Sequence, residues 1–113
     1  MEPIIKNIAP RTVVRLADQV AYLPGQIVSR TLAQDAHHSV TLFAFDAGEE
    51  ISTHEAGGDA FVLALDGTGR ITIAGEEFDV HAGEAIVMPA RVPHAVFATT
   101  RFTMMLTVLN ASA

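Results

Sequence analysis

The 113-residue chain contains no cysteine and few basic residues. Without cysteine, the chain can form no disulfide bond and no zinc site built from thiolates. Seven Lys and Arg residues stand against thirteen Asp and Glu, which gives a net charge of −6. That balance repels phosphate backbones and anionic lipids. We therefore expect neither a nucleic acid nor a membrane as a partner.

Long apolar runs are also lacking. No segment approaches the roughly 20 consecutive apolar residues of a membrane-spanning helix, and the N-terminus lacks the basic and apolar regions of a secretory signal. We expect a cytoplasmic protein, because a reducing compartment suits a chain without cysteine. The length is typical of one domain, and half of the residues are apolar, which is enough for a hydrophobic core that needs no disulfide bond or structural metal.

From residue 39 onward, turn signals recur roughly every eight to ten residues, a spacing typical of β-sandwiches and barrels. None of the segments between them is long enough to form a crossover helix. The pattern therefore predicts an all-β fold in which the turn Gly67-Thr68-Gly69 closes a hairpin. The predicted strands cover residues 39–46, 60–66, 69–74, 77–81, 85–88, 95–99 and 102–109.

Residues 1–38 follow a different pattern from the predicted barrel over residues 39–113, and we interpret them as an N-terminal extension. Residues 11–18, which follow Pro10, predict one or two helical turns. Residues 22–32, interrupted by a Pro-Gly pair, predict one or two edge strands.

The segment 60–65 is apolar on both faces of its predicted strand. One face carries only small side chains, which suit a crowded barrel interior, whereas the other carries Phe61, Leu63 and Leu65 and needs a cover. We predict that a second copy of the chain supplies this cover, which makes the protein a homodimer with contacts from the extension. The alternative is that residues 1–38 cover their own barrel.

Two glycine-framed segments carry a family resemblance. The first runs from Gly48 through His54 to Gly67, and the second runs from Gly83 through Pro89 to His94 and on to Ala98. Together they resemble the two sequence motifs of the cupin superfamily. The resemblance implies a double-stranded β-helix, or jelly-roll barrel, with a small-molecule pocket inside it.

The resemblance also implies a metal site, from which this chain departs. In cupins, two histidines and a glutamate of the first motif and the histidine of the second motif hold a divalent metal. His54 and His94 occupy the first and last positions, but Ala56 and Ala60 replace the other two. Asp59 follows two glycines that permit a bulge, which could turn its carboxylate inward. His54, His94 and Asp59 are therefore the candidate ligands of Fe, Mn, Ni or Zn; the alternative is a polar pocket without metal.

The sequence leaves the function open between three interpretations. The first is a stand-alone cupin that binds a small molecule in its barrel. The second is a metal-dependent oxygenase or isomerase of a small organic acid, phenol or sugar derivative, and the third is a non-catalytic sensor or accessory dimer. No catalytic residue is assigned. The predicted pocket residues are His54, Ala56, Ala60, Val62, Met88, His94, Val96 and Met104.

Overall fold

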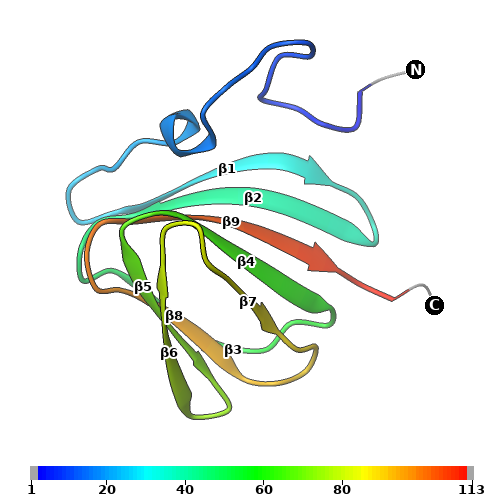
Figure 1. Cartoon of the computed structure of the whole chain (residues 1–113). Coiled ribbons are helices and arrows are strands. Elements are labelled where there is room, and N and C mark those ends of the chain that lie inside the picture. The colour runs from blue at the N-terminus through cyan, green and yellow to red at the C-terminus, as the bar shows by residue number, and fades with distance from the viewer. Residues whose placement is uncertain (1–2, 112–113) are drawn as a thin grey trace.

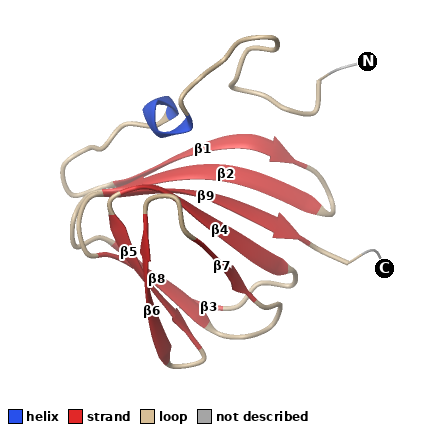
Figure 2. Cartoon of the chain, viewed as in Figure 1, coloured by secondary structure: helices blue, strands red, loops and turns tan. Residues whose placement is uncertain are grey.

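The computed structural model describes residues 3–111, which form two antiparallel sheets facing one another (Figure 1). One sheet has five strands in the order β1-β2-β9-β4-β7, and the other has four in the order β3-β8-β5-β6. The all-β jelly-roll prediction is confirmed, since strands dominate the chain in Figure 2. The strands are β1 (Ile27–Gln34), β2 (His38–Phe45), β3 (Glu50–His54), β4 (Asp59–Asp66), β5 (Thr68–Ile73), β6 (Glu76–His81), β7 (Ala85–Met88), β8 (His94–Ala98) and β9 (Phe102–Leu109).

Two turns show how local sequence sets the path of the chain. Ala74 and Gly75 join the paired strands β5 and β6, and both have a positive φ, of 50° and 83°, as a type I′ hairpin requires. The prediction of a hairpin at residues 67–69 is wrong. β4 pairs with β7 and β9, whereas β5 pairs with β6 and β8, so Gly67 turns the chain from one sheet into the other.

The core lies between the two sheets, and β4 shows why its sequence alternates. Ala60, Val62 and Ala64 are at most 1% exposed and point inward, as predicted from their small size. Phe61 points outward and is 42% exposed. Small residues are needed inside because large side chains from other strands fill the same space, namely Phe45, Ile71, Met88, Phe102 and Met104.

The N-terminal segment crosses the outer face of the five-stranded sheet (Figure 1). It contains one turn of 3-10 helix, η1 (Leu16–Gln19), which confirms part of the helical prediction for residues 11–18. Val20 from this segment joins Leu42 and Ala44 from β2 in a second apolar cluster. Residues 3–38 thus cover part of their own barrel, and β1 pairs with β2 as an edge strand. No helix among residues 3–111 is long and apolar enough to cross a membrane.

Candidate functional site

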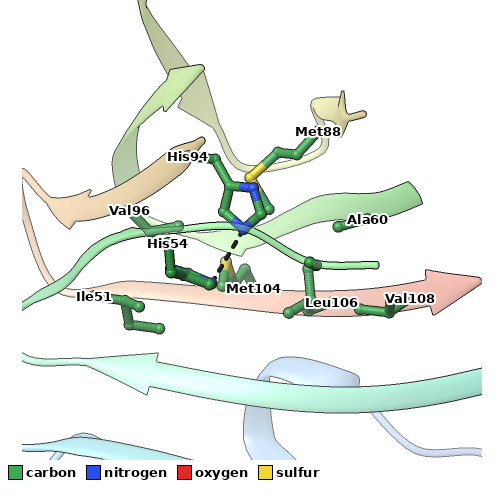
Figure 3. A pocket seen from close by; sticks show the side chains of 10 residues that line it. Ile51, His54, Ala60, Met88, His94, Val96, Met104, Leu106 and Val108 are labelled. Carbon is green, nitrogen blue, oxygen red and sulfur yellow. Dashed lines mark hydrogen bonds between the residues drawn. The ribbon is translucent and has the colours of Figure 1, made fainter. Parts of the chain in front are cut away.

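A cavity of about 80 Å³ opens between the two sheets. Its floor is formed by buried side chains that include Met88 and Met104, and His54 lies at its exposed rim. Its wall is apolar apart from two histidines (Figure 3). The lining residues are Ile51, His54, Ala56, Ala60, Met88, His94, Val96, Met104, Leu106 and Val108.

The sheet register brings the two histidines together. His54 ends β3 and His94 begins β8, and the two residues are paired directly across these antiparallel strands. The register shifts between Ile51 and His54. In a regular strand, residues three apart point to opposite faces. The irregularity therefore allows both of these side chains to line the cavity.

A backbone carbonyl group faces the Nδ1 atom of each imidazole, and this contact indicates which tautomer each ring adopts. The Nδ1–H of His54 donates to the carbonyl oxygen of Ser52 at 2.9 Å, and the Nδ1–H of His94 donates to that of Val92 at 3.2 Å. A carbonyl oxygen only accepts, so both protons of the neutral pair are placed on Nδ1. Both Nε2 atoms are then unprotonated acceptors.

The two Nε2 atoms lie 3.1 Å apart, with the ring planes inclined at 74° (Figure 3). This is hydrogen-bond distance, and a bond between the two atoms needs a proton on one Nε2. The neutral pair with both protons on Nδ1 lacks that proton, so its two lone pairs repel until a proton donor or another electron-pair acceptor binds them. Burial and, second, the neighbouring His54 lower the pKa of His94 below its usual value, while its bond to Val92 partly opposes this. Charging His94 is therefore unfavourable. The pair thus presents two acceptors to any donor that enters the cavity.

Asp59, the predicted third metal ligand, is not brought to the histidines. It lies next to the inward-facing Ala60, so it points to the opposite face of β4, and its carboxylate accepts the amide N–H of Ala90 at 2.9 Å. No group of three His, Cys, Asp or Glu residues able to hold a metal is present in residues 3–111. The residues present do not fit the divalent metal site of the family, and Asp59 instead anchors the loop before β8.

Seven of the eight predicted pocket residues line the cavity, all except Val62. Val62 lies two residues further along β4 than Ala60 and is fully buried in the core beyond the cavity. Sequence reasoning missed Ile51, Leu106 and Val108. The last two share the face of Met104 by simple alternation, a signal present in the sequence, whereas Ile51 depends on the irregularity in β3.

A comparison with protein-family models matches residues 41–110 to the cupin domain. The chain belongs to the cupin family. None of the curated proteins compared with this cupin matches it. The match covers both histidines and all the residues that line the cavity.

Solved structures agree with this assignment. A conserved protein of unknown function from Streptococcus pyogenes, SPY1581, is 40% identical with a TM-score of 0.96, and the alignment covers 99% of this cupin and 98% of that chain. A cupin superfamily protein from Desulfitobacterium hafniense is 30% identical with a TM-score of 0.91, and the alignment covers 95% of this cupin and 98% of that chain. A cupin 2 conserved barrel domain protein from Leptotrichia buccalis is 41% identical with a TM-score of 0.81, and the alignment covers 83% of this cupin and 46% of that chain.

Proposed function

We propose that this cupin binds a small molecule in its barrel cavity, through a hydroxyl group whose single proton is shared between the Nε2 atoms of His54 and His94. The observation that carries the proposal is the pair of acceptor Nε2 atoms, 3.1 Å apart, in a cavity that is otherwise apolar. A donor placed against them removes the repulsion within the pair. The apolar wall favours a ligand with a short hydrocarbon body.

The size of the cavity limits the ligand. Ordinary ligand pockets enclose about 300–1,000 Å³, whereas this cavity has about 80 Å³. A complete sugar or other many-atom ligand is too large to be enclosed. We therefore propose a ligand of few non-hydrogen atoms, such as a phenol whose hydroxyl faces the histidines and whose ring lies against the apolar wall.

Binding without catalysis is the better supported of the alternatives. An oxygenase or isomerase that uses a family-type metal needs a third ligand beside His54 and His94, and the carboxylate of Asp59 is held by Ala90 instead. The proposed binding needs only the two histidines and the apolar wall. Ligand binding of this kind is also what a sensor or accessory subunit requires.

Phenol and toluene form a matched pair of probes, because they differ by one hydroxyl group. In an NMR titration, we expect phenol to shift the signals of cavity residues and to bind roughly 2- to 10-fold more tightly than toluene, the value of one hydrogen bond. His54→Leu should abolish this preference. His37→Leu, a change at an exposed residue outside the cavity, should leave it intact.

Equal binding of the two probes by the unchanged protein would contradict the role of the histidines. Absence of any shift at cavity residues, with either probe near its solubility limit, would contradict the proposed binding itself.

We also propose that a second copy of the chain covers the remaining apolar surface. Phe61 and Val87 are neighbours in register on the outer face of the five-stranded sheet, and they are 42% and 50% exposed. Both side chains are uncharged, so two copies related by a two-fold axis could meet there despite a net charge of −6 on each.

A further inference from the structure

Two methionine side chains accompany the histidines in the cavity. Met88 ends β7 and is 2% exposed, and Met104 lies in β9 and is fully buried. Both line the same cavity as His54 and His94, and their sulfur atoms are turned toward the imidazoles in Figure 3. The cavity therefore contains four donor atoms, two imidazole nitrogens and two thioether sulfurs, that come from four different strands.

The histidines are arranged as metal-binding histidines usually are. Such residues typically donate their other ring N–H to a backbone carbonyl or a carboxylate, which fixes the ring and leaves the ligating nitrogen unprotonated. His54 and His94 do this through Ser52 and Val92. Bonds of ~2.0–2.1 Å, the length of Zn–N bonds, to two atoms 3.1 Å apart enclose an angle of about 95–102°, somewhat below the tetrahedral value.

The chemistry of the four donors selects the charge and softness of the ion. All four are neutral, and no carboxylate joins them among the described residues. A divalent ion would leave two uncompensated charges in an apolar cavity, whereas a monovalent ion leaves one. Thioether sulfur also favours soft ions, Cu(I) above all, and imidazole binds copper well.

We propose that this cavity binds one Cu(I) ion through the Nε2 atoms of His54 and His94 and the sulfur atoms of Met88 and Met104. The inference rests on the proposed function only in that the cavity must be open to a ligand. It differs from the family's metal site in two of the four donors, in the charge of the ion, and in the absence of a carboxylate. The chain has no cysteine to compete for the ion.

The test is a competition titration under anaerobic, reducing conditions. Untagged protein is added to Cu(I) bound to a coloured chelator, and the loss of colour measures the copper that the protein withdraws. We expect one equivalent per chain. Met88→Leu and Met104→Leu should each weaken Cu(I) binding by about tenfold or more.

Met105→Leu is the matched control, since Met105 is adjacent to Met104 in β9 but does not line the cavity. Methionine-to-leucine changes keep the core volume nearly constant, so the variants should fold. A second readout needs no variant. When Ag(I) is added to protein labelled with ¹³C in its methionine methyl groups, the signals of Met88 and Met104 should shift and that of Met105 should not.

Three results would overturn the proposal: no withdrawal of Cu(I), unchanged Cu(I) affinity in both cavity methionine variants, or a Met105 signal that shifts in place of the cavity signals. The phenol titration separates this failure from failure of the proposed function. Phenol binding without copper binding leaves the small-molecule proposal standing, and copper binding without phenol binding refutes that proposal alone.

Discussion

Replacing Tyr22 by phenylalanine removes one oxygen atom that joins the N-terminal segment to the barrel. The Tyr22 hydroxyl donates to the carboxylate of Asp66 at 2.6 Å and accepts the hydroxyl proton of Thr103 at 2.7 Å. Arg101 lies 5.5 Å from the centre of the same ring. In Tyr22→Phe the ring remains, so the apolar cluster around it is retained and only the hydrogen bonds are lost.

The cost follows from the burial of Thr103, which is 1% exposed. No buried side-chain polar atom among residues 3–111 lacks a partner, and the substitution would create one, at about 1–3 kcal/mol. The lost bond to the exposed Asp66 adds about 1 kcal/mol or less. We expect the free energy of unfolding to fall by about 2–3 kcal/mol, which lowers the urea midpoint by about 1–2 M for a protein of this size.

A double-mutant cycle tests the reasoning. Tyr22→Phe leaves the Thr103 hydroxyl without a hydrogen-bond partner, and Thr103→Val removes that hydroxyl. The double variant should therefore be little less stable than Tyr22→Phe alone. The coupling energy between the two substitutions should be about 1–2 kcal/mol. Additive losses would refute the explanation, and so would a single-variant loss below about 0.5 kcal/mol.

The pH dependence gives a second check. Burial, and then the bond to Asp66, raise the pKa of Tyr22 to about 12 from 10.0. The folded state thus favours the neutral phenol, and its stabilisation is complete below pH 10 and is lost as the pH rises through 12. Tyr22 is the single tyrosine of the chain. The stability difference between the wild type and Tyr22→Phe should therefore shrink across that range.

Ala74→Asn should raise the free energy of unfolding by about 0.5–1 kcal/mol in urea titrations, since Asn tolerates the positive φ that this turn residue adopts. A fall of the same size in the free energy of unfolding would mean that the type I′ turn is not formed. Light scattering at micromolar concentration should give about twice the 12.0 kDa chain mass, and Phe61→Glu or Val87→Lys should reduce it to one chain. A single-chain mass for the unchanged protein would contradict the proposed dimer.

The fold was predictable because it depends on patterns that local sequence carries. The alternation of Ala60, Val62 and Ala64 with larger neighbours identified the inward face of β4, and the glycine frame identified the family. The turn at Gly67 was not predictable in type, because a hairpin and a turn between sheets use the same residues. They differ only in which strands pair, and strand pairing is not local.

The candidate site was predictable in its residues but not in its chemistry. Sequence position placed His54 and His94 in the pocket, and alternation placed most of its wall. The protonation of the two imidazoles depends on the carbonyl groups that face Nδ1, and this is a property of the folded backbone. Asp59 shows the opposite case, in which a carboxylate near the site in sequence is used to hold a loop.

The protonation of the histidines is the central claim of this account, and long-range ¹H–¹⁵N NMR of the imidazole rings measures it directly. At neutral pH in the ligand-free protein, His54 and His94 should both carry their proton on Nδ1 and show unprotonated Nε2 nitrogens. A proton found on Nε2 of either ring, donated to the other, would mean that the pair satisfies itself, and would contradict both proposed ligands.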